Sequence, residues 1–266
     1  MKIGVFDSGF GGLTVLRALL RQIPGADYAY LGDTARLPYG AKSRATVARY
    51  ASSSARFLVE EEAADFLVIA CNTASALALD AIRESVSVPV LGVVETGAHA
   101  ADASSTTRDV LVIATAATVE SHAYAAACAE RNMRAIEKAC PLLVPLVEEG
   151  WTEHPVTEEV VRIYMGELME QAANAGMNAD TLVLACTHYP LLRQTIERVV
   201  PRQVRVIDSA EVTAQQVAGR LKSVGGSAGN PQVDFFATDS VTKFRDLGTR
   251  FLGQAISGVR LVDLGG

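Results

Sequence analysis

Two cysteines in matching contexts are the residues of this chain best suited to chemistry. Cys71 ends the stretch D-F-L-V-I-A-C, and Cys186 ends D-T-L-V-L-A-C, about half a chain later. Each follows a strand-like run and precedes the expected start of a helix, where backbone amides and the helix dipole lower the pKa of a thiol. The repeat predicts two half-sites facing one ligand, each with a sulfur. Such a pair suits an enzyme that moves a proton from one side of a carbon atom to the other.

A structural role and a metal-binding role are the alternatives for these thiols. Buried cysteines are common small hydrophobic residues, so the matched contexts are what favour function. Cys128 and Cys140 have no such context, and we predict that they are structural. A metal site is not expected, because the chain has four histidines and no C-x-x-C cluster, whereas zinc needs three or four ligands close together.

Strand-like apolar runs alternate with stretches of helical periodicity along the chain. The predicted strands span residues 2–6, 27–31, 66–70, 89–94, 109–114, 180–185, 203–207, 232–237 and 258–263. The predicted helices span residues 12–22, 43–62, 74–85, 117–132, 156–175, 190–199, 209–223 and 240–254. This alternation predicts an α/β fold with mainly parallel sheets, and apolar strands are expected where helices cover both faces.

The duplication predicts two similar doubly wound lobes with the active site in the cleft between them. We expect residues 1–97 and 209–266 to form the first lobe and residues 98–208 the second. Residues 98–107 are small and polar enough to cross between lobes, and residues 223–231 are predicted to be a flexible surface connection. Ligands of such sheets bind at the carboxyl ends of the strands, where both cysteines lie.

Composition excludes several classes of function. The chain has 266 residues, of which 49% are hydrophobic and 20% charged, so it can bury a sizeable core. A net charge of −6 argues against nucleic acid as a partner. No apolar run approaches the roughly 18–20 residues of a membrane span, and we find no signal-peptide pattern. Four cysteines are too few for a disulfide framework, so we expect a cytoplasmic protein with reduced thiols.

Two glycine-containing segments could bind a small anion. Asp7 lies in F-D-S-G-F-G-G-L-T, whose glycines expose backbone amides, and it could assist proton transfer or simply cap the next helix. The segment L-G-D-T-A-R-L-P-Y-G, residues 31–40, could offer the amides of Tyr39 and Gly40 to a carboxylate, or could be an ordinary surface turn.

Two segments of the second half are further candidates. A-T-A-A-T-V places Thr115 and Thr118 at the start of a helix, which they could cap, or where they could bind an anion. Glu148 and Glu149, in P-L-V-E-E-G, could belong to the site or be solvated.

Four of these motifs together resemble one family. The motifs D-S-G-F-G-G-L-T, D-T-A-R-L-P-Y-G, A-C-N-T-A-S and A-C-T-H-Y-P, in this order, are similar to those of glutamate racemases, in the aspartate/glutamate racemase superfamily. The similarity runs from residue 3 to about residue 263. It implies cofactor-independent interconversion of L- and D-glutamate for peptidoglycan synthesis, with no pyridoxal phosphate. It also implies two α/β lobes and a homodimer.

The resemblance assigns a role to each matching position. Cys71 and Cys186 would be the acid/base residues, acting on D- and L-glutamate respectively, with Asp7 and His188 assisting them. Glu148 would be a further acidic residue near the second thiol. The residues implied to hold the substrate are Asp7, Ser8, Pro38, Tyr39, Gly40, Asn72, Thr73, Thr115, Thr118, Thr187 and His188.

Two other functions compete with this interpretation. A racemase acting on aspartate or a related acid would share the chemistry, because one methylene of substrate length is hard to infer from sequence. A two-lobed binding protein that senses an amino acid would share the architecture. The paired thiols and the missing signal-peptide pattern argue against the binding protein.

Overall fold

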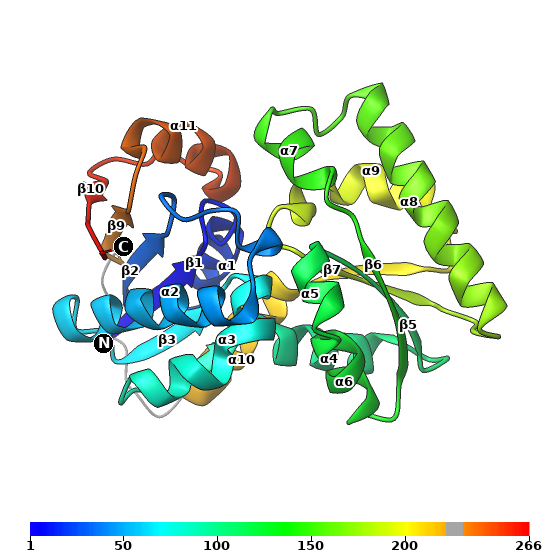
Figure 1. Ribbon diagram of the computed structural model, residues 1–266, viewed down its shortest axis with the longest axis horizontal. Helices are drawn as coiled ribbons and strands as arrows, with labels where there is room; N and C mark the ends of the chain where they lie inside the picture. Colours follow the sequence, from blue (N-terminus) through cyan, green and yellow to red (C-terminus); the bar gives the residue numbers. More distant parts are fainter. Residues whose placement is uncertain (222–230, 266) are drawn as a thin grey trace.

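Two parallel β-sheets organise the chain, and the computed structural model describes residues 1–221 and 231–265. The first sheet has the strand order β10-β9-β2-β1-β3-β4 and the second β6-β5-β7-β8, and every paired strand is parallel to its neighbour. Figure 1 shows the two sheets side by side, each with helices around it. The predicted α/β class with two doubly wound lobes is confirmed. The predicted surface connection over 223–231 lies almost wholly outside the described residues.

The elements of the first sheet come from both ends of the described chain. Its strands are β1 (Lys2–Asp7), β2 (Asp27–Gly32), β3 (Phe66–Ile69), β4 (Val90–Gly92), β9 (Val233–Ala237) and β10 (Arg260–Leu261). Its helices are α1 (Leu13–Gln22), α2 (Arg44–Arg56), α3 (Asn72–Ser85), α10 (Ser209–Leu221) and α11 (Val241–Leu252), with short helical turns η1 (Tyr39–Ala41) and η2 (Phe57–Glu61).

The second sheet is formed by the middle of the chain. Its strands are β5 (Asp109–Ala114), β6 (Arg134–Ala139), β7 (Thr181–Ala185) and β8 (Arg205–Asp208). Its helices are α4 (Val93–Ser104), α5 (Ala116–Glu120), α6 (Ala123–Ala129), α7 (Leu143–Glu148), α8 (Pro155–Asn174) and α9 (Arg193–Val199), with the turn η3 (Tyr189–Leu192). Among the described helices, none is both long and apolar enough to cross a bilayer.

The central strands are apolar over most of their length because helices cover both of their faces. In β1, Ile3 and Val5 pack in the same cluster as the buried face of α1, whereas Phe6 packs with residues of α2 and α3. In β5, Leu111 packs on the side of α8, and Val112 packs on the side of α4 and α6. Both faces of each sheet are thereby packed against helices, which positions the strand ends.

The prediction for residues 89–107 is wrong in detail. Residues 93–104 form the helix α4, so no strand extends to residue 94 and most of the segment 98–107 is helical. The chain does pass from the first sheet to the second between β4 and β5, a stretch that includes the predicted crossing. The small residues serve close packing between helices instead, since a Cβ atom on Gly97 would lie 2.9 Å from Tyr124 Oη. A helix rich in small residues, which allow a second helix to approach closely, has a composition similar to that of a loop and is hard to recognise from the sequence alone.

Three further differences lie in the second lobe. The strand β6 was not predicted, because as a partly exposed edge strand it mixes apolar and charged residues rather than being apolar throughout. The expected single helix over 117–132 is two helices, broken at His122, whose φ of +54° lies in the left-handed region. The short helix α7, which contains Glu148, also went unpredicted.

Candidate active site

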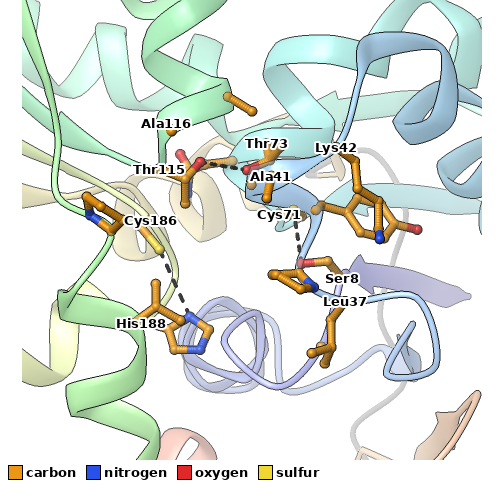
Figure 2. Close-up of a pocket in the computed structure, with 18 of the residues that line it drawn as sticks. Ser8, Leu37, Ala41, Lys42, Cys71, Thr73, Thr115, Ala116, Cys186 and His188 are labelled. Carbon is orange, nitrogen blue, oxygen red and sulfur yellow. Dashed lines mark hydrogen bonds between the residues drawn. The ribbon is translucent and has the colours of Figure 1, made fainter.

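A cavity of about 540 Å³ lies between the two sheets, beyond the carboxyl ends of β1, β3, β5 and β7. Figure 2 shows Cys71, which follows β3, and Cys186, which follows β7, brought to it from the two lobes. Most of the predicted site residues line it: Ser8, Pro38, Tyr39, Gly40, Cys71, Asn72, Thr73, Thr115, Glu148, Cys186, Thr187 and His188. Asp7 and Thr118 do not line the wall and are buried behind it.

Cys71 occupies the N-cap position of α3. Its Sγ accepts a hydrogen bond from the Ala74 amide at 3.4 Å and lies 3.4 Å from Ser8 Oγ. The expectation of a lowered pKa is wrong for this thiol. Burial, followed by the charge of the nearby Asp7 carboxylate, raises the pKa of Cys71 to about 12, because desolvation outweighs the helix amides. This sulfur therefore holds a proton.

Asp7 ends β1 directly behind the cavity. Its Oδ2 accepts a hydrogen bond from the Gly9 amide at 2.9 Å, and its Oδ1 is buried without a partner among the described residues. Burial raises the pKa of Asp7 above its ordinary value, although the charge of His188 and nearby amides oppose the shift. The carboxyl group thus acts on Cys71 and on His188 without lining the cavity itself.

Cys186, His188 and Glu148 form a chain of contacts in the second lobe. Cys186 Sγ lies 4.0 Å from His188 Nδ1, and His188 Nε2 lies 3.4 Å from Glu148 Oε1. Burial opposes a charged imidazole, but hydrogen bonds to Cys186 and Glu148 outweigh it and raise the pKa of His188 to about 10. The same contact with His188 lowers the pKa of Glu148. The arrangement keeps a positive imidazolium beside the second sulfur.

The predicted threonines form a hydroxyl cluster that joins the lobes. Thr73 Oγ1 lies 2.9 Å from Thr115 Oγ1 and 3.3 Å from Thr118 Oγ1. Thr115 is at the N-cap position of α5, yet its side chain makes no capping bond, so the capping role suggested by the sequence is wrong for it. Thr118 is fully buried and supports the other two hydroxyls rather than lining the cavity.

The hydrogen-bond partners of Asn72 and Tyr39 determine which polar groups are left available to a ligand in the cavity. Asn72 Oδ1 accepts a hydrogen bond of 2.6 Å from Tyr124, while its buried Nδ2 has no partner among the described residues. An unpaired buried amide is a donor that a ligand oxygen can satisfy. The Tyr39 hydroxyl donates to the buried carboxylate of Asp33, which fixes the turn that carries Gly40.

Several cavity residues were missed by sequence reasoning. Beyond the predicted set, the wall includes Gly9, Phe10, Leu37, Ala41, Lys42, Ser43, Ala116, Ala117, Glu120, Pro141, Val144 and Pro145. Ala41, Lys42 and Ser43 directly follow the predicted P-Y-G turn, so extending that motif by three residues would have found them. The segment 141–145 precedes and enters α7, and only the tertiary structure brings it to the cavity.

The charge on His188 predicts a pH-dependent contribution to stability. Its folded pKa lies above the unfolded value, so the contribution is complete below about pH 6.5 and is lost as the pH rises toward about 10. We expect the loss of unfolding free energy caused by His188→Gln to be larger at pH 6 than at pH 10, by on the order of a few kcal/mol. Urea unfolding of both proteins at the two pH values measures this. A loss that is constant or grows with pH would argue against the charged imidazole.

Comparison with known proteins places this site in a family. The Asp/Glu/Hydantoin racemase family model matches residues 3–217. A glutamate racemase of Koribacter versatilis (strain Ellin345) is 52% identical over 288 aligned positions, covering 99% of this chain and 98% of that protein. One of Geobacter metallireducens is 45% identical, covering 98% and 96%. The crystal structure of glutamate racemase from Francisella tularensis in complex with D-glutamate matches with a TM-score of 0.89 at 35% identity, covering 99% of this chain and 97% of that one.

The fold, the two-thiol cavity and the family match define the class of protein. The chain belongs to the Asp/Glu/Hydantoin racemase family and is an amino-acid racemase. Within that family it is similar to glutamate racemases over nearly its whole length, which confirms the resemblance inferred from the four sequence motifs.

Proposed function

We propose that this protein interconverts L- and D-glutamate without a cofactor, by proton transfer between two thiols. The observation that carries the proposal is one cavity lined by a free thiol from each lobe, each with different electrostatic neighbours. Cys71 lies near the Asp7 carboxyl and holds its proton, while Cys186 lies beside a charged imidazole. A two-base racemase needs this asymmetry, because one sulfur must accept a proton while the other donates one.

In the proposed mechanism, Cys186 removes the α-proton of L-glutamate, and Cys71 delivers a proton to the opposite face. The reverse reaction starts from the Cys71 thiolate and D-glutamate, with Asp7 assisting Cys71 and the pair His188–Glu148 assisting Cys186. Hydrogen-bond donors fixed before the reaction stabilise the negative charge that develops beside the α-carboxylate. The free Nδ2 of Asn72 is one such donor.

The remaining predicted residues would grip the two carboxylates and the amino group of the substrate. They are Ser8, Pro38, Tyr39, Gly40, Thr73, Thr115 and Thr187, with Thr118 as a support behind them. Glutamate is favoured over aspartate because the relatives of 40–52% identity are glutamate racemases and one solved relative is in complex with D-glutamate.

We further propose the cellular setting implied by the resemblance. The protein would supply D-glutamate for peptidoglycan, in the cytoplasm, as a homodimer. Residues 1–97 with 209–266 and residues 98–208 would be its two lobes. The strands support this division, because β1–β4 and β9–β10 form one sheet and β5–β8 the other.

The direct test is circular dichroism of L-glutamate incubated with the purified protein in deuterated buffer, with L-aspartate in parallel and no added cofactor. We expect loss of the optical signal and incorporation of α-deuterium with glutamate only. Loss of the signal with aspartate instead would support the same racemisation chemistry with aspartate as the substrate. Folded protein with free thiols that changes neither amino acid would refute the proposed function.

A further inference from the structure

Helix α11 of the first lobe contacts the catalytic half-site proposed for the second lobe. Lys243 and Arg250 are seven residues apart, two turns along the same helix face, and Phe251 follows directly. Figure 1 shows α11 and α7 facing each other across the same side of the molecule. Buried Phe244 and Leu247 attach α11 firmly to the first lobe, so its exposed basic groups have a fixed base.

All three of these residues meet the chain of contacts that ends at Cys186. Lys243 Nζ lies 3.4 Å from Glu148 Oε2, and Arg250 Nη1 donates to the Glu148 carbonyl oxygen at 3.2 Å. The ring of Phe251 meets the His188 ring edge-on, with centroids 5.0 Å apart. Glu148 therefore has His188 on Oε1 and Lys243 on Oε2, so the two contacts together fix the plane of its carboxylate.

We propose that Lys243 is a positioning residue for the Cys186 half-site, which holds the Glu148 carboxylate against His188 from the opposite lobe. Without the ammonium group, Glu148 has room to turn away, because a cavity of about 720 Å³ lined by Glu148, Lys243 and Asp239 lies beyond it. His188 would then lose its partner on Nε2, and Cys186 would lose part of its positive neighbour. This inference rests on the proposed role of Cys186.

The charged groups around this cluster come from both lobes, and Glu149, Asp239 and Asp246 line the adjoining cavity together with Glu148 and Lys243. His188 faces Cys186 on its own loop, Glu148 on α7 and Asp7 on β1. Glu148 faces His188, Lys243 and, through its backbone, Arg250. Lys243 Nζ also lies 5.7 Å from the centroid of the ring of the cavity residue Phe10, so its ammonium group also faces an aromatic ring of the first lobe.

The test compares Lys243→Met, Lys243→Arg and the matched control Arg245→Met. Arg245 is on the same helix, is exposed to a similar extent and pairs with Asp246 rather than Glu148. The rate at which iodoacetamide alkylates each cysteine at pH 7 is measured by peptide mass spectrometry. We expect Lys243→Met to slow alkylation of Cys186 about fivefold, the scale of a partly exposed ion pair, while Cys71 stays within about twofold.

The Arg variant should restore the rate, and Arg245→Met should leave it unchanged. Equal slowing of both cysteines, or no rescue by arginine, would show a general structural effect and overturn the inference, as would an unchanged Cys186 rate. Glutamate kcat/KM should fall in parallel with the Cys186 rate. Alkylation needs no substrate, so a wild-type protein that fails to racemise glutamate would refute the proposed function while the alkylation result still decides the role of Lys243.

Discussion

Replacement of Cys71 or Cys186 with alanine is expected to lower glutamate racemisation at least about 10³-fold, because inversion needs both an acceptor and a donor of the proton. The two sulfurs come from different lobes and line the same cavity, and neither is in a disulfide. Circular dichroism of L- and D-glutamate measures the loss. A serine variant of either cysteine with near-normal turnover would contradict the two-thiol mechanism.

Hydrogen exchange separates the roles of the two thiols more sharply than the rate does. The equilibrium constant of a racemisation is one, so kcat/KM must fall equally in both directions. Cys186→Ala retains only the sulfur assigned to D-glutamate, and we expect it to incorporate solvent deuterium into D-glutamate alone. Cys71→Ala should label L-glutamate alone. The reverse pattern would support the two-thiol mechanism but would assign Cys71 to L-glutamate and Cys186 to D-glutamate.

Cys128→Ala is the matched control for both alanine variants. Cys128 is also a fully buried free thiol, and it does not line the cavity. Its removal should lower stability through a lost core contact while racemisation per folded molecule stays within about twofold. A comparable loss of activity in this variant would show that the effects at the other two cysteines are structural.

Gly11→Ala is expected to lower kcat/KM about 10²-fold, since displacement of reacting groups by about 1 Å has an effect of that size. A Cβ atom at this position would lie 2.8 Å from His188 Nδ1 and would overlap the side chain of Thr187. Those two residues belong to the opposite lobe, so the methyl group would push the half-sites apart. Steady-state kinetics with both enantiomers measure the change.

Gly166→Ala supplies the matching control for this methyl group. Gly166 is exposed on α8, with nothing within 4 Å of the added Cβ atom. The change should leave activity unaltered and raise stability by up to about 1 kcal/mol, because alanine is the better helix former. If Gly11→Ala retained full activity, close contact between the lobes at this point would not be needed for catalysis.

Strong local patterns in the sequence were sufficient for the fold class. The apolar strands β1, β3, β5 and β7 are buried on both faces, so their composition alone indicated a parallel sheet under helices. The edge strand β6 and the helix α4 were not predicted, because their residue types depend on exposure and contacts in the folded protein. The charged residues of β6 are accommodated because the strand lies at an exposed edge of its sheet. Small residues are needed in α4 because the helix packs closely against Tyr124.

The candidate site, too, was predictable from the sequence only in part. Most of its residues lie in short motifs at strand ends, so the sequence alone placed them at the mouth of a cleft. Tyr124, which holds Asn72, lies outside the motifs, and Asp33, which holds Tyr39, lies inside one of them but was not predicted to have a role. The contact of Tyr124 with Asn72 joins segments 52 residues apart, which no local pattern contains, whereas Asp33 and Tyr39 are six residues apart and only the folded turn shows that they meet.

By itself, the sequence determined the α/β architecture, the two thiols and the family, because each is encoded in residue types at fixed short spacings. Only the tertiary structure decided the protonation of the site. Burial raised the pKa of Cys71 against the helix amides that the sequence predicted would lower it. The pKa of His188 rises despite its burial because Cys186 and Glu148, the latter forty positions away, lie against its ring. Desolvation and charge pairing depend on distances in space, and those are set only when the chain has folded.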